Sequence, residues 1–396
     1  MSKIVKYLMM LGIFTSPLYL LPSGSIQAYH VLLFVMTMAA FIKVGGLSPK
    51  PVVIAVLVFW AYVIVRQILF IMATAEASFT TLLYPTLNML VFLGVYTVLT
   101  EVISPRGIKG VLHAIAAALV FETGYIFIEN GSLTFFLNNA ERSVGTFNNP
   151  NQLGYFAVLM GCAYVSIATV INSSKLYASL FVSLAYLLAI ISLSKAAMLA
   201  ISPLMLLAFI SWGRGIRSGL LKAVIITSVL VLLLLSIVIL VSQLENLAQS
   251  DNEVIRRLAL IGQDSDDNLV DRGYALLLNP DWRIIFGYGE GYYNMLFGNE
   301  VHSTLANVIT SFGVAGFILF SSMILTIVQY RIVSMQFGLL GLVLAYGLTH
   351  NGLRNTLFWV FLAIIAWSAR YAMDAKNKPA LRLATPKKIR QMSAMV

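Results

Sequence analysis

The stretch PVVIAVLVFWAYVIVRQILFIMA, residues 51–73, decides the fold of this chain. It contains a single charged residue, Arg66, and a helix needs about 20 consecutive apolar residues to cross the hydrocarbon core of a bilayer. The stretch is therefore predicted to be a transmembrane helix. Scanning outward for similar apolar runs predicts about twelve such helices, at residues 4–21, 29–43, 51–73, 80–100, 107–128, 152–172, 176–192, 196–212, 219–242, 304–326, 334–349 and 355–372.

The composition agrees with an all-α integral membrane protein. Hydrophobic residues make up 59% of the 396 residues and charged residues only 11%, whereas soluble domains are about 25% charged. The predicted helices leave no room for a separate soluble domain, so residues 1–396 are expected to form one polytopic membrane domain. The apolar run that follows Lys3 and Lys6 is interpreted as an uncleaved first helix. The single cysteine, Cys162, excludes an intrachain disulfide and a thiolate metal cluster, and neither a cofactor nor a metal is predicted.

The basic residues predict the orientation in the membrane. If the N-terminus is cytoplasmic, most of the 26 Lys and Arg residues fall in cytoplasmic connections and in the tail at 373–396. The positive-inside rule favours this arrangement, with both termini in the cytoplasm. A basic flank after a final helix is more often an orientation and lipid-headgroup signal than a nucleic-acid site. The net charge of +10 thus predicts contact with membrane lipids and not with nucleic acid.

Two longer connections are predicted on the outer side, at 129–150 and at 243–303. The second precedes the tenth helix and contains GYGEGYY, residues 287–293. No strand precedes this segment and no helix start is evident after it, so it is not a nucleotide-binding fingerprint. Glycines interleaved with aromatic rings suit sugar stacking, with Tyr292 as a candidate, but a plain turn fits equally well. No internal repeat is visible, and the late position of the loop argues against a symmetric transporter.

Four short motifs carry a resemblance to a known family. They are RSVGTFNNPNQLG at residues 142–154, Ser194-Lys195-Ala196, Asp271-Arg272, and His302-Ser303 followed after nine residues by Gly313-x2-Gly316. Over residues 140–325 the chain resembles the bacterial O-antigen polymerase and O-antigen ligase superfamily. The resemblance implies a metal-independent, inverting glycosyltransferase of the integral-membrane (GT-C) type. Such an enzyme works at the outer face of the cytoplasmic (inner) membrane on glycans linked to undecaprenyl pyrophosphate.

The chemistry needs cations around a leaving group that gains charge, and an acceptor for the proton of the incoming hydroxyl. Arg272 is the first candidate for the pyrophosphate, because a guanidinium binds phosphate oxygens bidentately. Family members usually carry arginine where Lys195 stands, so here the second contact would be a point charge. His302 would accept the proton or orient the acceptor hydroxyl. The alternative is that His302 only caps the helix that follows it.

Further polar residues in or near the predicted helices are secondary candidates. Arg142 would contact phosphate or glycan, or would be an ordinary surface charge. Asn149 to Asn151 are interpreted as a helix cap with proline in the first turn. Arg66 and Glu122 lie inside predicted helices, where ionisable residues mark functional sites by default. They would pair with each other to fix helix packing, or Arg66 would help to hold the pyrophosphate.

One polar turn precedes the last predicted helix and contains His350, Asn351 and Arg354. A purely structural role is favoured for this turn, although Arg354 is retained as a candidate substrate ligand.

Three functions fit these residues. A polymerase joins two lipid-linked repeat units into O-antigen or capsular polysaccharide and is preferred. A ligase would transfer the lipid-linked glycan to lipid A core or to a protein, and a flippase or transporter would make no bond. The partners implied are the undecaprenyl-pyrophosphate-linked donor and acceptor, with a chain-length regulator and a flippase of the same pathway.

Overall fold

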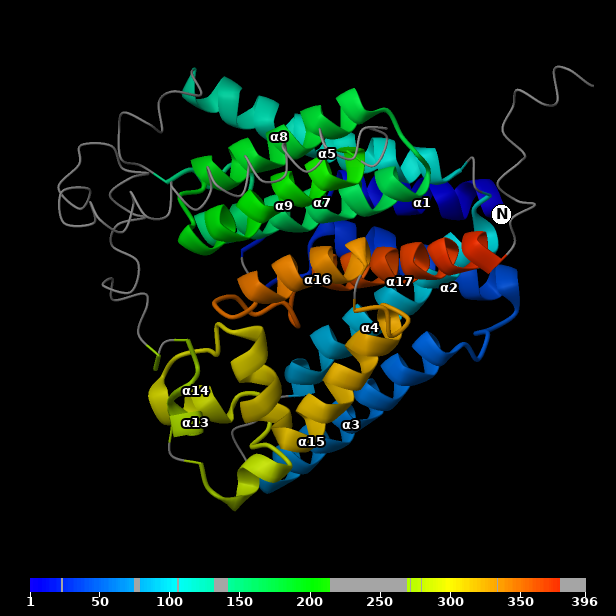
Figure 1. The fold of residues 1–396 in the computed structure, drawn as a ribbon. Helices are drawn as coiled ribbons and strands as arrows, with labels where there is room; N and C mark the ends of the chain where they lie inside the picture. Colours follow the sequence, from blue (N-terminus) through cyan, green and yellow to red (C-terminus); the bar gives the residue numbers. More distant parts are fainter. Residues whose placement is uncertain are drawn as a thin grey trace, which may run out of the picture.

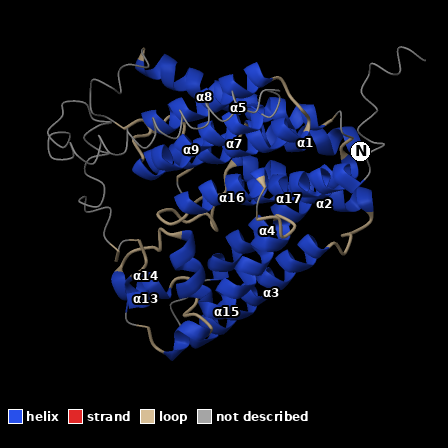
Figure 2. Cartoon of the chain, viewed as in Figure 1, coloured by secondary structure: helices blue, strands red, loops and turns tan. Residues whose placement is uncertain are grey.

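The computed structural model describes residues 1–22, 24–74, 79–104, 107–131, 142–213, 269–270, 272–278, 280–332 and 334–377. All secondary structure in these ranges is helical (Figure 2). The predicted helix at 219–242, the first part of the predicted loop at 243–303, Asp271 and most of the basic tail at 373–396 lie outside the described residues. Every other predicted apolar segment coincides with a helix.

The helices follow one another along the chain with short connections between most of them. They are α1 (Ser2–Phe14), α2 (Ala28–Val44), α3 (Pro51–Ala73), η1 (Phe79–Leu82), α4 (Leu83–Thr97), the π-helix η2 (Val98–Val102), α5 (Ile108–Asn130), α7 (Pro150–Val170), α8 (Lys175–Ile191), α9 (Lys195–Gly213), α13 (Ala275–Leu278), η4 (Trp282–Ile285), α14 (Tyr292–Phe297), α15 (Thr304–Ile327), α16 (Met335–Tyr346) and α17 (Thr356–Asn377).

Within the described ranges, six helices are long and apolar enough to cross a membrane. They are Pro51–Ala73, Leu83–Val102, Ile108–Asn130, Pro150–Val170, Thr304–Ile327 and Thr356–Asp374. The prediction of an all-α membrane protein is confirmed at this level. Four shorter apolar helices, Ala28–Val44, Lys175–Ile191, Lys195–Met205 and Met335–Tyr346, pack among them.

The bundle is built around α7 and α17, which pack against each other (Figure 1). A buried hydrogen bond of 2.8 Å joins Ser166 Oγ on α7 to Ser368 Oγ on α17. Helices α5, α8 and α9 pack on α7, and α4 packs on α17. By contrast α3 and α15 form a pair at the edge of the bundle, and only a third of the apolar length of α3 is buried.

Helix α1 is shorter than predicted, ending at Phe14 instead of near residue 21. Pro17 lies three residues beyond this end. A proline inside a helix removes a backbone donor and clashes with the carbonyl four residues earlier. The prediction from apolar content alone missed this stop signal.

Helix α15 is broken at Gly313, whose φ of 73° and ψ of −174° are not helical. Residues 287–289 of the GYGEGYY segment fill the break. The Tyr288 amide donates to the Thr310 carbonyl at 2.8 Å, and the Gly289 amide donates to the Ser311 carbonyl at 2.9 Å. Carbonyl groups that the break leaves without a helical partner are thereby satisfied.

The other side of the inserted segment is held by α3. The Arg66 guanidinium donates to the Gly287 carbonyl through Nε at 2.8 Å and through Nη2 at 2.5 Å. The Gln67 amide donates to the Glu290 carbonyl at 3.0 Å and accepts from the Glu290 amide at 2.8 Å. The segment is therefore part of the packing between α3 and α15, and its first residues form the turn that was one of its two interpretations. Contrary to the expectation that no helix starts here, α14 begins at Tyr292.

Candidate active site

A cavity of about 390 Å³ lies where α7 and α9 begin and α16 ends. Three of the basic residues singled out in the sequence, Arg142, Lys195 and Arg272, line it together. We call it the cationic cavity. The described residues that line it include these three basic side chains and no carboxylate, a composition that suits an anion.

Arg142 is held at the cavity by the first turn of α7. Its Nη2 donates to Asn151 Oδ1 at 2.7 Å, and its Nε donates to the Ser192 carbonyl at 3.3 Å. Helix α7 packs closely on the start of α9 at Gly154. A Cβ atom at this position would lie 2.9 Å from Ala197 Cβ, so the close packing requires glycine. The predicted cap is confirmed: Asn149 accepts from the Gln152 amide, and Pro150 occupies the first turn.

Arg272 reaches the cavity from the segment before α13. Its Nη1 donates to the Thr349 carbonyl at 2.7 Å. Two residues later, the Tyr274 hydroxyl lies 2.8 Å from Ser303 Oγ and donates to the Leu348 carbonyl at 2.9 Å. These contacts fix the late loop to the turn that follows α16.

Lys195 is the first residue of α9, where the helix dipole adds to its positive charge. Deeper along α9 and α16 the lining of the cavity becomes apolar, formed by Leu199, Ala200, Pro203, Leu342 and Ala345. Leu199 is one turn below Lys195 and Pro203 two turns, which is about 6 Å and 12 Å along the axis. The cavity is thus cationic where α9 begins and apolar further along α9, where Leu199 is 57% exposed.

His350 lines the same cavity and was missed as a site residue. Its ring stacks on Tyr346, with centroids 4.3 Å apart, and Tyr346 in turn stacks on Tyr155 at 4.8 Å. Nδ1 lies 2.9 Å from Thr349 Oγ1, while Nε2 is buried and has no hydrogen-bond partner among the described residues. Burial, together with the charges of Arg272, His302 and Arg142, lowers the pKa of His350 to about 3.

His302 is exposed and lies close enough to the cavity for its charge to act on His350. It does not cap α15, because Ser303 Oγ is the cap and accepts from the Ala306 amide at 3.1 Å. The alternative of a purely capping histidine is therefore wrong. Thr304 donates to the His350 carbonyl through both its amide, at 3.1 Å, and its hydroxyl, at 2.7 Å. This contact ties the segment of His302 to that of His350.

Arg66 and Glu122 do not pair, contrary to one of the two expectations for them. Arg66 binds the Gly287 carbonyl, as described above. Glu122 is buried and accepts from the Thr146 amide at 3.0 Å, with Thr146 Oγ1 2.6 Å from its other oxygen. Glu122 therefore holds the loop that leads from Arg142 into α7. A backbone carbonyl and a loop threonine are partners that a search for opposite charges does not find.

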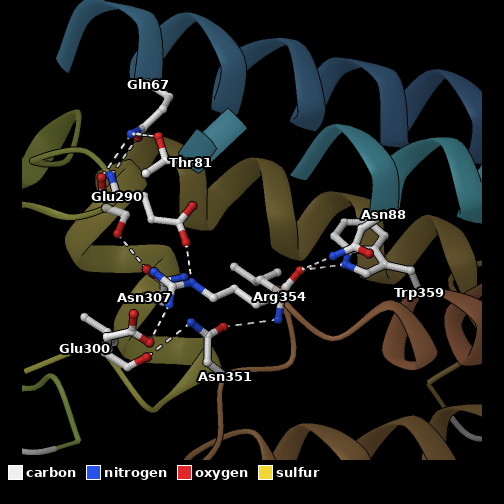
Figure 3. A network of polar contacts seen from close by, with 12 residues as sticks. Gln67, Thr81, Asn88, Glu290, Glu300, Asn307, Asn351, Arg354 and Trp359 are labelled. Atoms are coloured by element: carbon white, nitrogen blue, oxygen red, sulfur yellow. Dashed lines mark hydrogen bonds and ion pairs between the residues drawn. The ribbon is translucent and has the colours of Figure 1, made fainter. Parts of the chain in front are cut away.

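Arg354 lies outside the cationic cavity, in a polar network between α3, α15 and the start of α17 (Figure 3). Its Nε contacts Glu290 Oε1 at 2.7 Å and its Nη1 contacts Glu300 Oε2 at 2.6 Å. The nearby Leu353 carbonyl accepts from both Asn88 and Trp359 at 2.9 Å. Because two carboxylates compensate the charge of Arg354, we assign it to the architecture of this turn.

Tyr292 also lies outside the lining of the cationic cavity. Its ring stacks on Tyr288 with a centroid distance of 5.0 Å and an angle of 7°. The Arg283 guanidinium lies 5.1 Å from the Tyr288 centroid and 5.5 Å from that of Tyr292, and it is bound to Asp281 at 2.6 Å. The ring that was a candidate for sugar stacking thus stacks within the protein.

The cavity also contains residues that carried no clear signal in the sequence. Asn151 links Arg142 to Tyr346, whose hydroxyl donates to the Asn151 carbonyl at 2.9 Å. Two signals were available in the sequence. Asn151 directly follows the proline of the first turn of α7, and His350 directly follows the predicted apolar segment at 334–349. Within the described ranges no group of three or more His, Cys, Asp or Glu residues is placed to hold a metal ion.

Comparison with known proteins does not assign the chain to a family. No family model matches the sequence, and no curated protein matches it.

Proposed function

We propose that this protein is a membrane glycosyltransferase that polymerises undecaprenyl-pyrophosphate-linked oligosaccharide repeat units into O-antigen or capsular polysaccharide. The observation that carries the proposal is the amphiphilic cationic cavity. Arg142, Lys195 and Arg272 at its cationic end suit the pyrophosphate, and the apolar side chains one and two turns further along α9 suit the start of the prenyl chain. A cavity for a soluble anion would not need this apolar extension.

The transfer proposed is metal-independent and inverting. The acceptor hydroxyl attacks the anomeric carbon, and undecaprenyl pyrophosphate leaves with its charge stabilised by the guanidinium groups of Arg142 and Arg272. Lys195 adds a third positive charge. An imidazole beside the cavity receives the proton of the hydroxyl, and His302 was the candidate for this role from the sequence.

The topology that accompanies the proposal has about twelve membrane crossings, with both termini in the cytoplasm and the cavity open to the outside of a bacterial cytoplasmic membrane. In support, the N-terminus and the end of α17 lie at the same end of the bundle, and the late loop with α13 and α14 lies at the other (Figure 1). A chain-length regulator and the flippase that supplies the repeat unit are the proposed partners.

The decisive experiment uses the lipid-linked repeat unit that accumulates in a strain lacking this gene. Purified full-length protein in lipid nanodiscs is incubated with this material, and the products are separated by size. A ladder of lengthened glycans without any added lipid A core supports the polymerase. Transfer only when lipid A core is supplied would replace it by the ligase, and translocation without a new glycosidic bond would replace it by a flippase.

A matched pair of variants connects the activity to the cavity. Arg272→Ala should reduce the rate of transfer at least 100-fold, on the order of the loss of one transition-state donor. Arg283→Ala is the control, since Arg283 lies in the same loop but is bound to Asp281 away from the cavity. Equal loss in both variants would show that the loop, and not the cavity, is being disturbed. Activity is expected to be unchanged in EDTA.

A further inference from the structure

Two imidazoles lie at the cationic cavity, and they differ in their surroundings. His302 is exposed and is not among the residues that line the cavity, whereas the His350 ring lines it. The Thr304 contacts to the His350 carbonyl hold the two histidine segments together. The imidazole nearest to a ligand in the cavity is therefore that of His350.

The contacts of His350 fit the tautomer with hydrogen on Nδ1. In this tautomer Nδ1 donates to Thr349 Oγ1 at 2.9 Å, and the Thr349 hydroxyl donates to the Tyr346 carbonyl at 3.1 Å. In a neutral ring the other nitrogen, Nε2, carries a lone pair. This lone pair has no partner among the described residues, although buried polar atoms in proteins nearly always have one.

We propose that His350 Nε2 accepts the proton of the attacking sugar hydroxyl. The proposal rests on the proposed glycosyl transfer. The hydroxyl oxygen forms a bond to the anomeric carbon while the bond from that carbon to the phosphate oxygen breaks. The hydroxyl proton moves to Nε2, and the electron pair of the broken bond leaves with the lipid pyrophosphate.

The charges around His350 couple this step to the presence of the donor. In the free cavity Arg272, His302 and Arg142 oppose a positive charge on the ring, with Lys195 also in the lining, and the low pKa of His350 reflects this field together with burial. A bound pyrophosphate compensates the arginine charges and therefore raises the pKa of His350. The ring is therefore a stronger base when a donor is bound than when the cavity is free.

The test uses inorganic pyrophosphate as the probe and NMR of ¹⁵N-histidine in the full-length protein. With four histidines in the chain, the spectrum of His350→Asn assigns the signal of His350. The free protein should show the neutral ring with hydrogen on Nδ1. Saturating pyrophosphate should raise the pKa of His350 by about one pH unit or more, and this rise should be absent in Arg272→Ala.

The opposite tautomer, or an unchanged pKa while pyrophosphate binds, would overturn the role of His350 and leave the proposed function intact. Binding is followed separately by thermal shift. Failure of pyrophosphate to bind the wild-type protein would overturn the proposed function, and the role of His350 with it.

Turnover gives a second readout. His350→Asn keeps a donor near the position of Nδ1 for Thr349 and removes Nε2, so transfer should fall about 100-fold or more while pyrophosphate affinity stays within about twofold. His113→Asn, on the exposed side of α5, is the matched control and should retain wild-type turnover. Near-normal turnover in His350→Asn would overturn the role of His350 as proton acceptor.

Discussion

The backbones of Gly287 and Gly313 lie in contact, and neither position has room for a side chain. A Cβ atom on Gly313 would overlap the Gly287 amide and lie 2.5 Å from the Ile285 carbonyl oxygen. A Cβ atom on Gly287 would overlap the Ser311 carbonyl and lie 2.5 Å from the Gly313 amide. Both residues have a φ in the left-handed region, 84° and 73°. The first glycine of the motif that begins at His302 is thus explained by packing.

Gly313→Ala should therefore destabilise the protein by about 1–3 kcal/mol, through backbone strain and the loss of contact with residues 287–289. The measurement is the thermal unfolding midpoint of the purified protein in detergent. Gly341→Ala in α16 is the control, because a Cβ there meets nothing within 4 Å and should leave the midpoint unchanged or slightly raised. Equal midpoints for Gly313→Ala and the wild type would contradict the packing described above.

Glu122 is expected to act as a neutral hydrogen-bonding group. The Thr146 hydroxyl lies 2.6 Å from both the Pro17 carbonyl and Glu122 Oε2, and one hydrogen cannot serve two acceptors. Glu122→Gln supplies the missing hydrogen and should preserve stability and transfer. Glu122→Ala leaves the Thr146 amide without its acceptor and should cost about 1–3 kcal/mol. The thermal unfolding midpoints of both variants check this prediction. A greater loss of stability in Glu122→Gln than in Glu122→Ala would contradict it.

Arg354 should matter for stability more than for binding of the donor. Its removal leaves Glu290, whose side chain is only 7% exposed, without a counter-charge. Arg354→Ala should cost about 1–3 kcal/mol, a figure reduced for the partial exposure of the guanidinium. Adding Glu290→Gln should recover part of this loss. A double variant no more stable than Arg354→Ala would show that the pair is not the cause.

The neutral His350 ring predicts a specific dependence of stability on pH. Its pKa in the folded state is about 3, below the ordinary value of 6.5, so the unfolded chain binds the proton more readily. Stability is therefore full above pH 6.5 and falls as the pH drops from 6.5 towards 3. His350→Asn should show a smaller loss between pH 6.5 and pH 4 in the same unfolding assay. Parallel curves for the two proteins would refute this assignment.

Arg272→Lys should weaken the donor only in part. A lysine keeps the positive charge but cannot bind two phosphate oxygens in a planar fork or reproduce the contact to the Thr349 carbonyl in the same geometry. The KM for the lipid-linked donor is expected to rise about tenfold, whereas Arg272→Ala is expected to lower the rate of transfer at least 100-fold. Full activity of the lysine variant would indicate that only charge is needed at this position.

The sequence was sufficient to predict the apolar helices within the described ranges, apart from the early end of α1, since apolar length depends only on composition along the chain. It also named Arg142, Lys195 and Arg272 as candidate substrate ligands, and the structure brings these three to one cavity. Their roles as ligands stay predictions. The cap at Asn149 and Pro150 was predictable because its signal lies within four residues.

What the sequence did not predict depends on partners far apart in the chain. The carbonyl bound by Arg66 is 221 residues away, at Gly287. The ring of Tyr292 was a candidate for sugar stacking. Its neighbours in the structure, Tyr288 and Arg283, become apparent only once residues 281–292 are folded. His350 seemed to be part of a polar turn, since nothing local indicates that its Nε2 would be buried without a partner.

The break in α15 gives the helix between His302 and Gly313 a fixed length. From Thr304 to Phe312 the helix rises about 12 Å before it stops at Gly313. His302, before the first residue of this helical segment, is therefore held at a fixed distance from residues 287–289, which α3 binds at its far end. Lengthening the helical segment by a single residue would rotate one end against the other by about 100°. The spacing between His302 and Gly313 thus sets a distance in the structure, whatever chemistry His302 performs.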